Sequence, residues 1–155
     1  MDIETTFDST YDMYEIIVSK ATVVDAAFNP VYVRLKLGGS YDTGSNYKGC
    51  NMVATTTTIN TANDAGLSYL RVVSAGLGNG TTDHFDLIMH IDAPDDTAFC
   101  KQVFWDGVAN TAGVPTRLWG AGSNTAITAL TGVRFYASSG NILAGTFRLY
   151  GIKNS

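Results

Sequence analysis

The chain has 155 residues, about the length of a single domain, and 45% of them are hydrophobic whereas only 15% are charged. Its net charge is −4, and its 10 lysine and arginine residues are scattered singly, so it lacks the basic cluster that neutralises a row of phosphates. No apolar run approaches the roughly 18 residues that span a bilayer. These properties argue against nucleic acid and membranes as partners.

The N-terminal segment, residues 1–9, is polar and is predicted to form a short arm before a single domain over residues 10–155. It has neither the basic start nor the apolar core of a signal peptide, so we expect assembly in a reducing cytoplasm. Cys50 and Cys100 are predicted to be two buried thiols, because free cysteine behaves as a small hydrophobic residue. A disulfide between them stays an open alternative.

Short runs rich in β-branched and aromatic residues follow the arm at intervals of roughly 10 to 15 residues. Turn-forming groups such as Gly38-Gly39 and Asn63-Asp64-Ala65-Gly66 separate them. No segment sustains the spacing of an amphipathic helix. The sequence therefore predicts an all-β fold, an antiparallel two-sheet β-sandwich that is jelly-roll-like, with a strand order that cannot be read. The expected strands are residues 11–20, 31–37, 50–59, 68–73, 83–91, 99–105, 116–119, 130–137 and 145–152.

The segment 83–92 has the clearest alternation in the chain. Side chains of a strand point alternately to opposite faces, so its apolar residues predict a buried row and its polar residues a solvent row. Ile88 interrupts the polar row, which indicates that a loop or a subunit covers part of this face. The buried row is Phe85, Leu87, Met89 and Ile91, and the polar row is His84, Asp86, His90 and Asp92.

The polar row does not predict a metal site. At about 3.3 Å per residue, His84 and His90 lie roughly 20 Å apart along an extended strand, too far to share one zinc ion. A local pair such as His84 with Asp86 would need outside ligands. We therefore expect no metal and no cofactor.

Catalytic arrangements are also missing from the sequence. There is no Gly-x-Ser-x-Gly nucleophile elbow, and the adjacent Asp95 and Asp96 lie in a loop, which gives no evidence of the roughly 5 to 9 Å spacing of glycosidase carboxylates. The glycine-rich segment 76–80 lacks a following helix or lysine, so it is predicted to be a turn and not a phosphate cradle. The protein is therefore not expected to be an enzyme.

Four aromatic residues and Ile88 are the candidates for a contact surface. Tyr41 and Tyr47 lie in the Gly/Ser loop after the second expected strand, and Trp105 and Trp119 lie near strand ends. Tyr and Trp carry a polar tip on a large apolar body, so they can form a subunit interface, pack inside the chain or stack on a sugar ring. The sequence leaves these three alternatives open and favours the first two.

The C-terminal segment 127–153 is the most informative part of the chain. Two runs rich in β-branched and aromatic residues flank residues 138–141, Ser-Ser-Gly-Asn, which favour a turn. We therefore predict a hairpin that closes a sheet. One face of the first run is formed by Val133, Phe135 and Ala137, and one face of the second by Phe147, Leu149 and Gly151.

Residues 131–153, TGVRFYASSGNILAGTFRLYGIK, resemble the C-terminal hairpin of a family of tailed-bacteriophage virion proteins, found in tail-fibre-like and capsid-decorating β-sandwich domains. Residues 7–24, FDSTYDMYEIIVSKATVV, are similar to that family's first strand, and residues 32–47, YVRLKLGGSYDTGSNY, to its second strand and loop. The resemblance brackets nearly the whole chain, with a more divergent middle. It implies a virion part with a β-sandwich fold.

The length of the chain discriminates between the two kinds of virion part in which the family is found, tail fibres and capsid decoration proteins. A compact chain of 155 residues has a radius of gyration of about 15 Å, so it is expected to be a stud and not a fibre with a shaft. The expectation is a capsid decoration or cement protein of the virion, bound to the major capsid protein between capsomers. Family and capsid symmetry imply a homotrimer, and the arm and the loop after Leu37 are contact candidates. The alternative is a tail-fibre or receptor-binding domain that recognises a host surface glycan.

Overall fold

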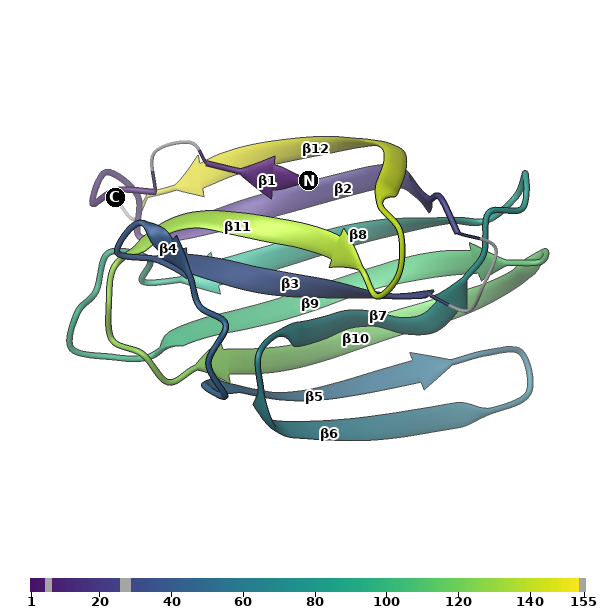
Figure 1. Cartoon of the computed structure of the whole chain (residues 1–155), viewed down its shortest axis with the longest axis horizontal. Coiled ribbons are helices and arrows are strands. Elements are labelled where there is room, and N and C mark those ends of the chain that lie inside the picture. The colour runs from purple at the N-terminus through teal and green to yellow at the C-terminus, as the bar shows by residue number, and fades with distance from the viewer. Residues whose placement is uncertain (5–6, 26–28, 154–155) are drawn as a thin grey trace.

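The computed structural model describes residues 1–4, 7–25 and 29–153. Over these residues it contains twelve strands and no helix, arranged as two antiparallel sheets that lie against each other (Figure 1). This confirms the predicted all-β, two-sheet β-sandwich. No helix among the described residues could cross a membrane.

The smaller sheet has five strands and lies in front in Figure 1. Its order is β1-β11-β3-β4, and β7 pairs with β3 beside β4. The strands are β1 (Asp2–Ile3), β3 (Asn29–Leu37), β4 (Ser40–Tyr41), β7 (Leu70–Leu77) and β11 (Leu130–Ala137).

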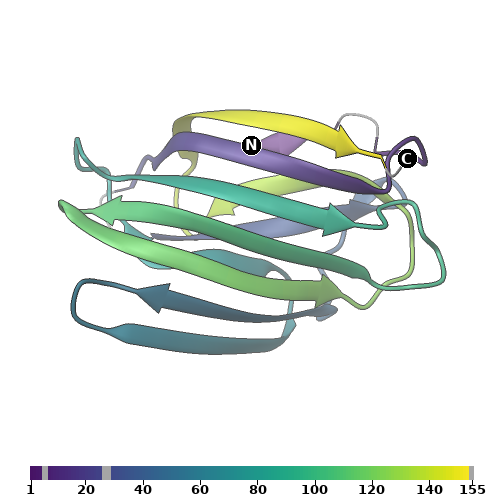
Figure 2. The same ribbon diagram turned by 180° about the vertical axis from the view of Figure 1, so that it is seen from behind.

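The larger sheet has seven strands, which Figure 2 shows side by side from the opposite direction. Its order is β12-β2-β8-β9-β10-β5-β6, so β12 and β6 are its two edges. The strands are β2 (Met13–Val23), β5 (Tyr47–Ala54), β6 (Ile59–Leu67), β8 (His84–Asp92), β9 (Lys101–Thr111), β10 (Val114–Asn124) and β12 (Ile142–Ile152).

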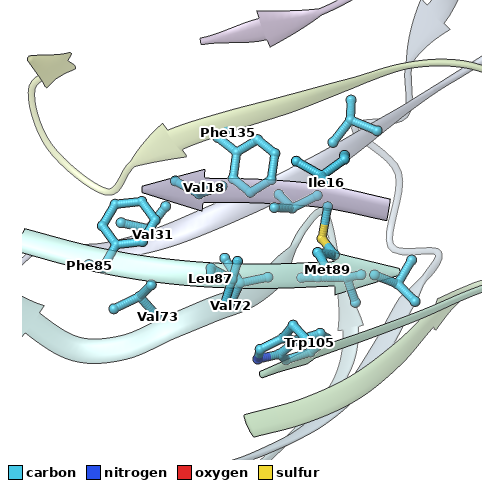
Figure 3. Packing of buried hydrophobic residues seen from close by; sticks show 14 of the residues in the cluster. Ile16, Val18, Val31, Val72, Val73, Phe85, Leu87, Met89, Trp105 and Phe135 are labelled. Carbon is cyan, nitrogen blue, oxygen red and sulfur yellow. The ribbon is translucent and has the colours of Figure 1, made fainter. Parts of the chain in front are cut away.

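The core fills the space between the sheets and takes one face of each central strand. In β8 the predicted alternation is confirmed, because the four residues of the predicted buried row are buried and the residues between them, Ile88 included, are not. The opposite sheet contributes Val31, Val73 and Phe135 to the same core (Figure 3). The buried row of β8 is Phe85, Leu87, Met89 and Ile91.

The predicted C-terminal hairpin is wrong, although its two strands and its turn are present. β11 pairs with β3 in the smaller sheet, whereas β12 pairs with β2 in the larger one. Residues 138–141 carry the chain from one sheet to the other, and a four-residue segment reaches about 13 Å, enough to cross the roughly 10 Å between packed sheets. The two runs therefore face each other across the core, where the rings of Phe135 and Phe147 lie 5.3 Å apart between centroids.

The middle of the chain also differs from expectation. The expected strand 50–59 is divided between β5 and β6, and the predicted loop 63–66 lies inside β6. The expected strands 99–105 and 116–119 are parts of the long hairpin β9–β10. Its two-residue turn, Ala112-Gly113, has positive φ at both positions, which matches the twist of the strands that it joins.

The predicted N-terminal arm is held in the smaller sheet by its first residues. β1 pairs with β11, and the terminal ammonium group of Met1 donates to the carbonyl oxygen of Phe135 at 2.9 Å. Ile3 is buried in the core, and the guanidinium group of Arg134 donates to both carboxylate oxygens of Asp2 at 2.7 and 2.6 Å. In β1 the charged Asp2 faces outward and the apolar Ile3 faces the core, and the strand pairs only with β11 at the edge of the smaller sheet. Residues 5–6 lie outside the described part.

The ion pair between Asp2 and Arg134 predicts that β1 detaches in acid. Hydrogen bonds from Arg134 lower the pKa of Asp2 below its ordinary value of 3.8. The stabilisation of β1 is therefore present above pH 3.8 and is lost as the pH falls through the lower, folded-state value. We expect the NMR methyl signal of Ile3 to move to its solvent-exposed position in that range, and at neutral pH in Arg134→Gln.

Two observations control this experiment. Arg148→Gln removes an exposed arginine from β12 and should leave the Ile3 signal unchanged at neutral pH. The methyl signal of Met89, which is buried in β8, reports whether the whole domain unfolds at the same time. An Ile3 signal in Arg134→Gln that matches the wild-type signal would show that the ion pair does not hold β1.

Candidate functional site

The outer face of the seven-stranded sheet forms an open groove of about 1200 Å³. Its lining residues come from β2, β8, β9, β10, β5 and β6, which follow one another in the sheet. Neighbouring strands lie about 4.8 Å apart, so the groove runs across them for about 24 Å. The site is therefore elongated and perpendicular to the strands.

Apolar side chains line the middle of the groove. The strand register places Ile17 of β2 beside Ile88 of β8, and Trp119 of β10 beside Met52 of β5. On β9, Asp106 lies between Ile88 and Trp119, and Phe104 and Val108 flank it on the same face. Exposed fractions are 42% for Ile88, 46% for Phe104 and 41% for Val108, high values for apolar residues in central strands. An apolar face of this kind is typical of a surface that binds another molecule.

Polar groups are set among these apolar residues. Arg117 and Asp106 form an ion pair on adjacent strands at 2.5 Å, with both side chains more than half exposed. An exposed pair of this kind contributes little to stability, so both groups are available to a ligand. Nearby, the ring of His90 stacks on Phe104 with centroids 4.5 Å apart, and its Nε2 lies 2.8 Å from a carboxylate oxygen of Glu15.

The two histidines of β8 are held separately. Nε2 of His84 lies 3.5 Å from a carboxylate oxygen of Asp86, whereas His90 contacts Glu15. Within the described residues, no group of three histidine, cysteine or carboxylate side chains could hold a metal ion. Each histidine of this face is therefore paired with one carboxylate, His84 with Asp86 and His90 with Glu15.

Two of the aromatic candidates are core residues and not surface residues. Trp105 is 3% exposed because β9 continues to Thr111, which places this residue in the middle of a strand, on the inward face with Val103. Tyr47 is fully buried, and its hydroxyl accepts from the backbone N–H of Leu35 at 2.9 Å. Burial raises the pKa of Tyr47 to about 12. Both side chains are therefore buried in the isolated chain.

Tyr41 lies on the other sheet, away from the groove. It is half-buried, its hydroxyl donates to a carboxylate oxygen of Glu4 at 2.9 Å, and Arg134 lies 4.0 Å above its ring. Of the five candidates, Ile88 and Trp119 lie together in the lining of the groove with partly exposed side chains, and the lining also includes the buried Trp105. Phe104 lies inside the predicted strand 99–105, where the alternation places it on the face opposite Val103 and Trp105. Val108 lies beyond the predicted end of that strand, and extending the alternation to residue 108 places it on the same face as Phe104.

The cysteines are both free, and the prediction that they are buried is wrong. Cys50 is exposed and Cys100 is half-buried. Cys50 lies on the outward face of β5, opposite Ala121 and Asn63 in the neighbouring strands, where the sheet has no covering layer. It lines the groove beside Met52.

A scan against models of known protein families finds no match, and no curated protein matches the chain. The groove is therefore the structural feature on which a function can be proposed.

Proposed function

We propose that this is a structural bacteriophage virion protein, a capsid decoration or cement protein that acts by binding and not by catalysis. The partner is the major capsid protein, contacted between capsomers through the groove of the seven-stranded sheet. The observation that carries the proposal is the set of half-exposed apolar side chains at the centre of this groove: Ile88, Phe104 and Val108. The resemblance of three segments to phage virion proteins supports the assignment to the virion.

The chemistry of the lining favours a protein surface as the occupant. The groove lining includes side chains with no hydrogen-bond donor and no strong acceptor, which are stabilised mainly by removal from water: Ile17, Met52, Ile88 and Val108. Completing the burial of one half-exposed side chain of this size stabilises a complex by about 1 kcal/mol. Several such side chains surround the ion pair between Asp106 and Arg117. Apolar side chains around a polar contact are typical of protein interfaces.

The second candidate function is recognition of a host surface glycan by a tail-fibre or receptor-binding domain. The observation in its favour is that the indole ring of Trp119 lines the same groove as the exposed pair Asp106 and Arg117. An aromatic ring can stack on a sugar, and a carboxylate and a guanidinium group can hydrogen-bond its hydroxyls. The exposed surface of the lining is mostly apolar, which makes this the weaker proposal.

Ile88→Lys is expected to weaken binding to capsids by about tenfold or more, because it places a charge at the centre of the buried contact. Ile88 is exposed, so its replacement should leave the thermal unfolding temperature nearly unchanged. The measurement is co-sedimentation of purified protein with phage heads that lack it. Phe99→Lys, in an exposed position before β9 and outside the groove, is the matched control.

Equal binding of Ile88→Lys and wild type would contradict the proposal. Absence of head binding, together with signals on a glycan array that Trp119→Ala removes, would instead favour the receptor-binding alternative. The Trp105→Ala variant is unsuitable for this purpose, because Trp105 is buried in the core.

A further inference from the structure

The two edges of the seven-stranded sheet differ in how they are protected. An edge strand leaves alternate backbone N–H and C=O groups without a partner, and proteins block such edges with bulges, charges or proline. In β12 the pairing register shifts twice near Ala144, and Arg148 follows. In β6 the only register shift lies at its end, where Gly66 has a positive φ of 68°. Residues 59–65 contain no lysine, arginine or proline, so they form a regular, unblocked edge.

This edge is complementary to itself. When two β6 strands run antiparallel with Ala62 opposite Ala62, Thr61 lies opposite Asn63, and Asn60 lies opposite Asp64. Both pairs join hydrogen-bonding side chains, and no like charges face each other. At the ends, Ile59, which is 68% exposed, lies opposite Ala65 and is partly covered by the second strand. The matched stretch ends where the register shift begins.

We propose that two copies of this chain pair through β6, antiparallel across a two-fold axis at Ala62. The charge of Asp64 does not oppose this pairing, because Arg71 of the same copy lies 3.2 Å from its carboxylate. The interface adds main-chain hydrogen bonds along seven residues of each strand and turns the two sheets into one. It is a two-fold assembly, in contrast to the trimer that the resemblance implies.

The pairing also joins the two grooves. Thr61 and Asn63 line the groove where it reaches β6, and directly opposed residues of an antiparallel pair lie on the same face of the sheet. The groove of each copy therefore meets the other at the two-fold axis, giving a continuous surface about 50 Å long. That the joined groove binds one elongated partner rests on the proposed function, whereas the dimer does not depend on it.

Sedimentation analysis of the purified chain tests the dimer without any binding partner. We expect a species of twice the 16.5 kDa mass of the chain. Ala62→Lys places two like charges opposite each other and should raise the dissociation constant about tenfold or more. Ala62 borders an opening of about 470 Å³, so the longer side chain has room outside the core. Leu143→Lys, at the opposite edge of the same sheet, should leave the dissociation constant unchanged.

A cysteine at position 62 tests the register directly and does not depend on the folding of Ala62→Lys. Directly opposed residues of an antiparallel pair have Cα atoms about 4.5 to 5.5 Å apart, within the range that a disulfide bridges. In a Cys50→Ser, Cys100→Ser background, Ala62→Cys should form a covalent dimer on mild oxidation, and Leu143→Cys should not. A monomer or a trimer in sedimentation, a dimer that Ala62→Lys leaves intact, or a dimer without the Ala62→Cys bridge would each overturn the proposal.

Discussion

Gly107→Ala is expected to lower the free energy of unfolding by about 3 kcal/mol, the upper range for overpacking a core. Gly107 lies in the middle of β9 and pairs with Leu87 of β8. A methyl group there would press against the backbone carbonyl oxygen of Asp86 and would lie 3.1 Å from Cα of Leu87. Both contacts are with backbone atoms of the neighbouring strand, which cannot move without breaking the ladder at the centre of the larger sheet.

Denaturant unfolding of the purified protein measures this effect, with Gly49→Ala as the matched control. Gly49 also lies within a strand of the larger sheet, but its added methyl group would be 3.4 Å from the nearest atom, the carbonyl oxygen of Ala121. That is an ordinary contact, so we expect a change below about 1 kcal/mol. Equal losses in the two variants would mean that the close approach of β8 to Gly107 is absent in solution.

Phe135→Ala is expected to cost about 3 to 5 kcal/mol, the usual range for removing a buried phenylalanine ring. Phe135 is fully buried in β11, and its ring packs on Phe147 of β12 across the core. Its loss leaves a cavity that touches both sheets at once, which the rigid strands can fill only in part. For a domain of this size the unfolding temperature should fall by about 10 °C.

Phe104→Ala distinguishes burial from the mere loss of a ring. The same number of atoms is removed, but Phe104 projects from the outer face of β9 and is about half exposed. We expect a loss of about 1 kcal/mol or less and an unfolding temperature close to that of the wild type. A larger loss for Phe104→Ala than for Phe135→Ala would reverse the assignment of the inner and outer faces.

Local patterns in the sequence were sufficient for the strands but not for their partners. The alternation in β8 predicts its buried row, and it identifies Ile88 as an apolar residue on the otherwise polar outer face. β6 was predicted in part as a loop because Asn63 to Gly66 favour turns, and only pairing with β5 makes them a strand. The turn at 138–141 was correctly located, yet nothing local specifies whether the next strand stays in the same sheet.

The groove could not be predicted from the sequence, because it depends on which strands are neighbours and on the register between them. Ile17, Ile88 and Trp119 come from three strands that are far apart in the sequence, and the register between strands brings them into one row. Trp105 was chosen as a surface candidate because its strand was predicted to end there. Val108 lies beyond that predicted end, whereas Phe104 lies inside the predicted strand, on the face opposite Trp105.

The pairing of β1 with β11 and of β2 with β12 joins the opening segments of the chain to its last ones. During synthesis, neither early strand has these neighbours until residues 130–152 have left the ribosome. Contacts between such distant positions close slowly, because a long loop must be ordered first. The core of the nascent chain therefore stays incomplete until residues 130–152 have been synthesised, a period in which chaperones have their main opportunity to act.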